Sequence, residues 1–143
     1  MNNLSKIDKA LDGAGFQTIF LVEDDEDDQE LIKIAFGKLS LKHQLQIVNN
    51  GQEMLDALEG QTSLPCLIIL DLNMPILNGI QTLKELKANP RFTKIPKVVF
   101  TTSDSEENKN KCYSYGAADY FIKPARMNEI VTTLEKIVSY CHS

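Results

Sequence analysis

Short runs of apolar residues alternate along the chain with longer stretches in which apolar positions recur every three or four residues. The short runs predict five strands, at about 17–22, 45–48, 66–70, 97–100 and 119–122. The longer stretches predict five helices, because an apolar face at this spacing is what a helix needs to cover a sheet. Strict alternation of strand and helix favours an α/β domain with a parallel sheet and helices on both faces.

The apolar faces of the predicted helices define part of the expected core. In the first helix this face comprises Leu31, Ala35 and Leu39. The last helix has the clearest face, which comprises Ile130, Leu134, Ile137, Val138 and Cys141. Residues 1–16 precede the alternating pattern, so we expect an N-terminal extension over 1–16 and one folded domain over 17–143.

The length and composition of the chain narrow the classes of protein. Its 143 residues suit one domain with a single sizeable core. Hydrophobic residues make up 43% of the chain, and no apolar run approaches the roughly 20 residues of a membrane span. We therefore expect a soluble protein with no membrane association. The net charge of -5 argues against direct binding of nucleic acid, whose phosphate backbone selects basic surfaces.

Cysteine and histidine are few and far apart in the sequence. The cysteines are Cys66, Cys112 and Cys141, and the histidines are His43 and His142. An odd number of widely spaced cysteines without a signal peptide predicts a cytoplasmic protein with no disulfide framework. Neither histidine has a ligand-type spacing from a cysteine, so we predict no metal site among these five residues.

Two of the predicted buried strands end in carboxylates. The run "IFLV" is followed by six consecutive acids, Glu23 to Asp28, and the run "CLIIL" is followed by Asp71. Acidic runs more often form solvated surface, so the first run alone does not define a site. Open α/β sheets, however, bind ligands outside the carboxyl ends of their strands. The two groups of acids can therefore converge at one edge of the sheet.

Four segments, at four of the five predicted strands, carry a family resemblance. They are "FLVEDD", "LIILDLNMPILNG", "VVFTTS" and "GAADYFIKPA". Together they resemble the receiver domain of two-component response regulators, over about residues 17–141. The segment "ANPRFTKIP" further resembles the stand-alone regulators associated with phytochrome-type kinases. The resemblance implies a flavodoxin-like, doubly wound sheet of five parallel strands in the order 2-1-3-4-5.

By this resemblance Asp71 is the phosphoacceptor, since a carboxylate can attack phosphorus as a nucleophile. A divalent cation is needed to offset the repulsion between this carboxylate and an incoming phosphoryl dianion. The resemblance implies a Mg²⁺ site made by Glu23, Asp24, Asp71 and Asn73. In that site Glu23 acts through metal-bound water and Asn73 through its backbone carbonyl, which matches the preference of Mg²⁺ for oxygen ligands and retained waters.

The remaining acids of the first run have a simpler explanation. Acidic side chains in the first turn of a helix are favoured by the helix dipole, so Asp25, Glu26, Asp27 and Asp28 are interpreted as helix-start and surface charges. An alternative stays open for Asp25. It would replace Glu23 as the second metal-site acid if the strand ended one residue later.

Three further residues correspond to functional positions of the family. Lys123, which precedes Pro124, matches the lysine that holds the phosphoryl oxygens, and the resemblance implies a cis peptide bond between the two residues. Thr101 matches the hydroxyl that closes on the phosphoryl group, and Thr102 is the competing candidate. Tyr120 matches the aromatic residue that changes rotamer with that threonine, although a packing role is the alternative.

These residues indicate a single-domain response regulator, not an enzyme, with no output domain after residue 143. It is expected to accept a phosphoryl group from a sensor histidine kinase or a histidine phosphotransfer protein. It would then signal through phosphorylation-dependent protein contacts with an unknown downstream protein or as a homodimer. The enzyme alternative is a phosphohydrolase, which would normally need a second acid where Asn73 stands. An unphosphorylated pseudo-receiver is disfavoured because every required functional group is present.

Overall fold

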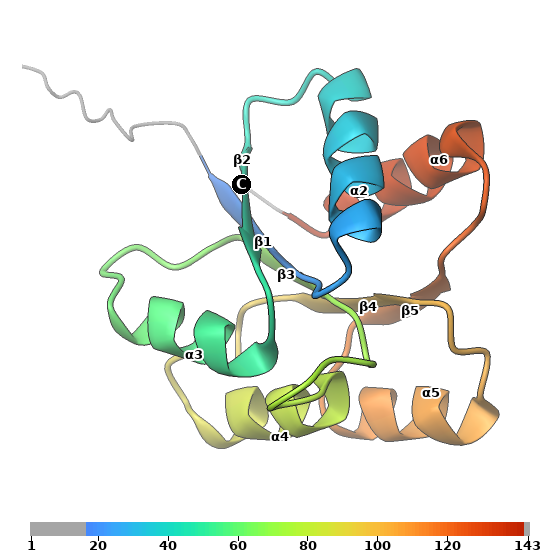
Figure 1. The fold of residues 1–143 in the computed structure, drawn as a ribbon. Coiled ribbons are helices and arrows are strands. Elements are labelled where there is room, and N and C mark those ends of the chain that lie inside the picture. The colour runs from blue at the N-terminus through green and yellow to red at the C-terminus, as the bar shows by residue number, and fades with distance from the viewer. Residues whose placement is uncertain (1–16, 142–143) are drawn as a thin grey trace, which may run out of the picture.

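The computed structural model, which describes residues 17–141, contains five strands that alternate with five helices (Figure 1). The strands are β1 (Thr18–Val22), β2 (Gln44–Val48), β3 (Leu67–Leu70), β4 (Lys97–Thr101) and β5 (Asp119–Ile122). The helices are α2 (Glu26–Lys38), α3 (Gly51–Glu59), α4 (Gly79–Ala88), α5 (Glu106–Ser114) and α6 (Met127–Val138). The predicted strands are confirmed to within one residue at each end.

The five strands form one parallel sheet in the order β2-β1-β3-β4-β5. This confirms the flavodoxin-like, doubly wound arrangement. The inner strand β1 pairs with β2 on one side and with the central strand β3 on the other, so that Val22 lies opposite both Val48 and Leu70. The carboxyl ends of β1 and β3 therefore lie side by side at one edge of the sheet, which is where their acids follow.

Helices cover both faces of the sheet, and the two cores follow the alternation of side chains along each strand. In β1, Phe20 and Val22 belong to the core shared with α3, α4 and α5, while Ile19 and Leu21 belong to the core shared with α2 and α6. The two groups of helices lie on opposite sides of the sheet (Figure 1). All four side chains are buried. A strand that is buried on both faces needs apolar residues at every position. This is why the apolar run of β1 could be recognised in the sequence.

The orientation of α2 differs from the prediction. Ile32 and Ala35 are its buried residues, whereas Leu31 is 39% exposed and Ile34 is 45% exposed. The predicted face through Leu31 was wrong because Leu31, Ile32 and Ile34 are all apolar, and their spacing alone does not fix which of them faces the sheet. The consequence is an apolar surface on α2 that the sheet does not cover.

The prediction about the cysteines was also wrong. Cys66 and Cys141 form a disulfide with a Cα–Cα distance of 5.0 Å, while Cys112 is free and buried. The two cysteines are 75 positions apart, so their spacing gave no signal. The parallel topology brings the residue before β3 next to the residues after α6, and a distance of this size suits a disulfide.

None of the helices between residues 17 and 141 has the length and apolar character needed to cross a bilayer. The N-terminal extension expected over residues 1–16 lies outside the described residues, so the proposed domain limits stay a prediction.

Candidate functional site

Backbone hydrogen bonds place three charged residues at the carboxyl edge of the sheet. The amide of Glu23 donates to the carbonyl of Val48 at 3.0 Å, and the amide of Asp71 donates to the carbonyl of Val22 at 3.1 Å. In the same way the amide of Lys123 donates to the carbonyl of Thr101 at 2.8 Å. These bonds continue the strand pairing by one residue, so each side chain leaves the sheet from a fixed position.

Three carboxylates meet at this edge. Glu23, Asp24 and Asp71 each offer an oxygen atom, and these oxygens all lie within 4.8 Å of one another. Glu23 and Asp71 are buried, whereas Asp24 is exposed. Burial raises the pKa of Glu23 to about 7, because the hydrogen bond from Lys123 opposes this shift only in part and the charge of Asp71 adds to it.

One ammonium group is shared among three carboxylates. Lys123 Nζ lies 2.7 Å from Asp28 Oδ2 and 3.3 Å from Asp71 Oδ2, and it also contacts Glu23 Oε1. Burial lowers the pKa of Lys123, but the hydrogen bonds to Asp28 and Glu23 and the charge of Asp71 outweigh it, so its pKa lies above the ordinary value. Lys123 is therefore a permanent cation at the centre of the acidic edge.

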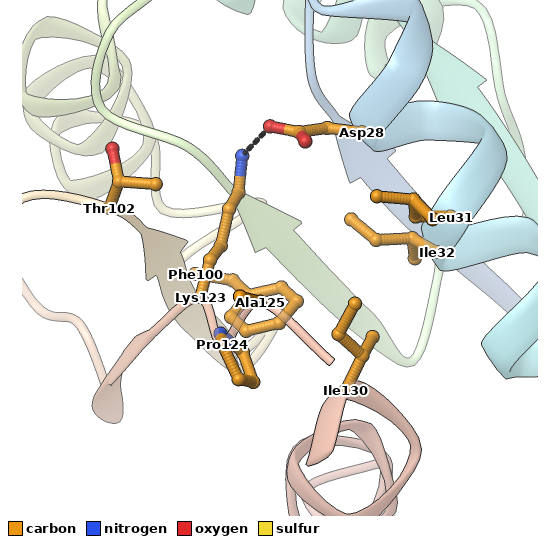
Figure 2. A pocket seen from close by; sticks show the side chains of 9 residues that line it. All are labelled: Asp28, Leu31, Ile32, Phe100, Thr102, Lys123, Pro124, Ala125 and Ile130. Carbon is orange, nitrogen blue, oxygen red and sulfur yellow. Dashed lines mark hydrogen bonds and ion pairs between the residues drawn. The ribbon is translucent and has the colours of Figure 1, made fainter. Parts of the chain in front are cut away.

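Asp28 is the residue of this site that sequence reasoning missed. It was interpreted as a surface charge, but its carboxylate contacts Lys123 (Figure 2). Asp28 is the third residue of α2, and an acidic side chain at this helix position can reach back over the helix start. That position was the available signal, and the length of the acidic run obscured it.

The start of α2 separates Asp25 from the acids that were predicted to bind the metal ion. The side chain of Asp25 is the N-cap of α2 and accepts a hydrogen bond from the amide of Asp28 at 3.0 Å. The strand ends at Val22, so the shift that would have exchanged Asp25 for Glu23 does not occur. Glu23 is the acid that lies with Asp24 and Asp71.

Thr101, the last residue of β4, and Thr102, which follows it, have different surroundings. Thr101 is fully buried, and its hydroxyl accepts a hydrogen bond from the amide of Ser103 at 3.4 Å. Thr102 is exposed and lines an open acidic pocket together with the six acids Glu23 to Asp28 and with Asp71, Asn73 and Lys123. Of the residues predicted for the site, Asn73 thus lies at the pocket and Thr101 lies behind it.

Tyr120 is hydrogen-bonded to Ser103, the residue whose amide contacts Thr101. Its side chain is 7% exposed, and its hydroxyl donates to the carbonyl of Ser103 at 2.7 Å. Lys109 Nζ lies 5.6 Å from the centre of its ring. The backbone of Ser103 therefore contacts both Thr101 and Tyr120, through its amide and its carbonyl respectively.

The loop from β3 to α4 holds the backbone of Asp71 in place. The amide of Gly79 donates to the carbonyl of Leu72 at 3.0 Å, and Asn78 caps α4 in a capping box with Gln81. A Cβ atom at Gly79 would clash with the carbonyl oxygen of Asp71 and lie 2.8 Å from Leu72 Cα. The start of α4 thus packs against the backbone of Asp71 too closely for any side chain.

The same loop contains a strained residue. Ile76 has a φ of 69° and is 78% exposed. A β-branched residue rarely adopts this left-handed conformation.

An apolar groove of about 200 Å³, whose lining residues are drawn in Figure 2, opens beside the acidic pocket. Its apolar lining comes from α2, β4, the loop after β5 and the first part of α6, and comprises Leu31, Ile32, Phe100, Pro124, Ala125 and Ile130. Asp28, Thr102 and Lys123 line the part of the groove nearest the acids. The exposed face of α2 and the phosphoacceptor candidate therefore belong to one continuous surface.

The peptide bond between Lys123 and Pro124 is not cis, as no cis peptide bond occurs between residues 17 and 141. The prediction taken from the family resemblance was therefore wrong for this bond. A trans bond is the ordinary state, because it is favoured by about 0.5–1 kcal/mol even before proline.

Comparison with known proteins establishes the family. The sequence pattern of the response regulator receiver domain matches residues 19–135. The fold and the convergence of acids with a lysine at the carboxyl edge agree with this match. The chain belongs to the response regulator receiver domain family.

Individual relatives cover most of the chain. The probable methanogenesis regulatory protein FilR2 of Methanothrix harundinacea is 35% identical over 126 residues, which are 85% of this chain and 81% of FilR2. Response regulator Rcp1 of Synechocystis is 31% identical over 129 residues, which are 87% of this chain and 88% of Rcp1.

Solved structures show the same relationship. The phosphorylated cyanobacterial phytochrome response regulator RcpA superposes with a TM-score of 0.81 at 31% identity, covering 89% of this chain and 94% of RcpA. The Mn²⁺-bound form of Rcp1 superposes with a TM-score of 0.78 at 31% identity, covering 86% of this chain and 92% of that one. The predicted resemblance to regulators associated with phytochromes is confirmed.

Proposed function

We propose that this protein is a stand-alone response regulator that accepts a phosphoryl group on Asp71 from the phosphohistidine of a sensor histidine kinase or a histidine phosphotransfer protein. The observation that carries the proposal is the meeting of Asp71 with Glu23, Asp24 and Lys123 at one edge of the sheet. An Asp71 oxygen forms the new bond to phosphorus while the bond from phosphorus to the histidine nitrogen breaks. The product is an aspartyl phosphate.

The donor atoms around Asp71 fit Mg²⁺. Glu23, Asp24 and Asp71 offer carboxylate oxygens within 4.8 Å of one another, and Asn73 lines the same pocket. An oxygen-only set with open access to water is what Mg²⁺ prefers, and a relative has been solved with Mn²⁺ bound. Bound Mg²⁺ would neutralise charge between the carboxylates and the phosphoryl oxygens.

Lys123 supplies the second positive charge. Its ammonium already lies 3.3 Å from Asp71 Oδ2, so a short movement lets it donate to a phosphoryl oxygen. Asp28 competes for the same ammonium at 2.7 Å. We therefore assign Asp28 a positioning role, in which it holds Lys123 over the pocket before the phosphoryl group arrives.

The apolar groove suits a donor helix. It begins at Asp28 and Lys123 and continues along Leu31 and Ile130, so an amphipathic helix lying in it would present a side chain to Asp71. Helix-in-groove docking of this kind uses an apolar face at helical spacing. The occupant we propose is the phosphohistidine-bearing helix of the kinase or phosphotransfer protein.

Output is proposed to run through the backbone of Ser103. A hydroxyl of Thr101 that turns toward the phosphoryl group would release the amide of Ser103, whose carbonyl holds Tyr120. Movement there would alter α5, β5 and the adjoining surface of α6, and so change contacts with a downstream protein or with a second copy. Hydrogen exchange with beryllofluoride, a phosphoryl mimic, tests this path. Unchanged protection over residues 101–125 would contradict it.

The central experiment is uptake of one phosphoryl group from acetyl phosphate with Mg²⁺, followed by mass analysis of peptides. We expect the added mass on Asp71 and none in Asp71→Asn, because the amide keeps the shape and loses the nucleophile. Asp27→Asn is the matched control, since Asp27 is an exposed acid of the same pocket and should leave uptake unchanged. Phosphorylation of Asp71→Asn would refute the assignment.

The same experiment separates a regulator from an enzyme. A phosphohydrolase with an aspartyl-phosphate intermediate would release phosphate from a small phosphoester continuously, whereas a regulator takes up one phosphoryl group per chain. Asn73 stands where such an enzyme normally needs its second acid, which favours the regulator.

A further inference from the structure

The amino edge of the sheet, opposite to Asp71, carries a second group of chemically reactive side chains. His43 directly precedes β2, Cys66 directly precedes β3, and Cys141 follows α6. A ring nitrogen of His43 and the two sulfur atoms all lie within 4.8 Å of one another. Three segments that are distant in sequence therefore place one imidazole and two sulfurs together.

One ring nitrogen of the imidazole in this group lacks a hydrogen-bond partner among the described residues. Nδ1 of His43 is buried and has no hydrogen-bond partner in the described part of the chain. Buried polar atoms are nearly always paired, and an unpaired one costs about 1–3 kcal/mol. Coordination of a metal through Nδ1 would remove this cost.

The two sulfurs are in a disulfide in the structure, but both cysteines are only partly buried. A thiol reductant can therefore reach them, as thiol–disulfide exchange requires access to a sulfur. Two reductant thiols give up two electrons and two protons. The products are Cys66 and Cys141 as free thiols and the reductant as its disulfide.

We propose that the reduced form binds one thiophilic metal ion, with Zn²⁺ the best fit, through the Cys66 and Cys141 thiolates and the His43 imidazole. Two thiol protons are released on binding, and water completes the four ligands. Sulfur and imidazole suit Zn²⁺ and exclude Mg²⁺, which takes oxygen ligands.

The geometry after reduction agrees with this proposal. Once the S–S bond is broken, the sulfurs must separate to non-bonded contact. Two Zn–S bonds of about 2.3 Å at a tetrahedral angle hold their sulfurs roughly 3.8 Å apart. Only a small movement of the two side chains therefore converts the disulfide site into a zinc site, and His43 already lies beside them.

Cobalt provides a spectroscopic test, because thiolate-bound Co²⁺ absorbs in the near ultraviolet and oxygen-bound Co²⁺ does not. The reduced full-length protein is titrated with Co²⁺ in excess Mg²⁺, which occupies the oxygen site around Asp71. We expect one equivalent to bind with a thiolate band and Zn²⁺ to displace it. The oxidised protein should show no band. A reduced wild-type protein without the band, or an oxidised protein with it, would overturn the proposal.

Variants assign the ligands. Cys66→Ser and Cys141→Ser should lose the thiolate band or retain only a weakened one, and His43→Gln should bind Co²⁺ about tenfold or more weakly. Cys112→Ser is the control for loss of a thiol outside the group. Unchanged affinity in His43→Gln would remove His43 from the site and refute the proposal. The far-ultraviolet circular dichroism spectrum of each variant shows whether it is folded.

Discussion

The two edges of the sheet carry opposite kinds of chemistry. The carboxyl edge collects hard oxygen groups around Lys123, whereas the amino edge collects sulfur and imidazole from His43, Cys66 and Cys141. The groups at the carboxyl edge directly follow buried strands, so they stand out in the sequence. Those at the amino edge come from the loop before β2, the residue before β3 and the segment after α6. Convergence there is a property of the topology and has no local pattern.

The largest effect on the free energy of unfolding is expected from removal of the disulfide at the amino edge. This change tests whether the amino edge stabilises the fold without affecting the carboxyl edge. The disulfide joins residues 75 positions apart, and a loop of that length corresponds to about 4.5 kcal/mol of lost chain entropy in the unfolded state. Cys141→Ser should lower the free energy of unfolding by up to that amount in urea. Reductant should destabilise the wild type and leave the variant unchanged. Loss of phosphoryl uptake in the folded variant would show that the edges are coupled.

The next effect concerns the close packing that positions Asp71. Gly79→Ala places a methyl group against the backbone of Asp71 and Leu72, so we expect a loss of about 1–3 kcal/mol in unfolding free energy and slower phosphoryl uptake. Gly37→Ala is the matched control, because Gly37 lies in α2 with nothing within 4 Å of a Cβ. That change should stabilise the protein by about 0.5–1 kcal/mol. Equal effects of the two substitutions would contradict this account of the loop.

A third experiment divides the acidic run. Asp24→Asn should weaken Mg²⁺ binding by about tenfold, roughly 1.4 kcal/mol, because Asp24 lies with Glu23 and Asp71. Asp28→Asn should change Mg²⁺ affinity less, since Asp28 contacts Lys123. Titration of both variants with Mg²⁺ measures the difference. Equal affinities would contradict the assignment of Asp24 to the Mg²⁺ site and of Asp28 to Lys123.

The smallest expected effect is a pH dependence of stability caused by Cys112, the free cysteine of the core. Burial raises the pKa of Cys112 to about 11 from its ordinary 9.0. A pKa raised by folding stabilises the protein below pH 9 and ceases to do so as the pH rises through 11. The wild type should therefore lose about 0.8 kcal/mol between neutral pH and pH 9.5 relative to Cys112→Ala. Identical pH profiles in urea unfolding would disprove the shift.

Sequence reasoning succeeded where a residue's position along a strand decides its place. Glu23, Asp71 and Lys123 each follow a strand, and the parallel sheet brings them together as expected. Their roles in phosphoryl transfer stay predictions.

Sequence reasoning failed where the position of a side chain depends on the rotation of a helix about its axis or on contacts between distant parts of the chain. Leu31 was placed in the core although α2 turns Ile32 inward, and Asp28 was placed on the surface although its helix position directs it to Lys123. The partnership of Cys66 with Cys141 depends on where the last helix ends relative to β3. No local pattern contains that information.

The acidic pocket contains more negative than positive side chains, and this excess affects how fast a phosphodonor reaches Asp71. Six consecutive acids and Asp71 line the pocket, and Lys123 is the one cation among its lining residues. Such a field concentrates cations and slows the approach of small anions, over a Debye length of about 8 Å at physiological ionic strength. A free anionic phosphodonor therefore reaches Asp71 more slowly as salt is removed. A donor carried on a protein is held in place by contacts outside the pocket, so its rate depends less on this repulsion.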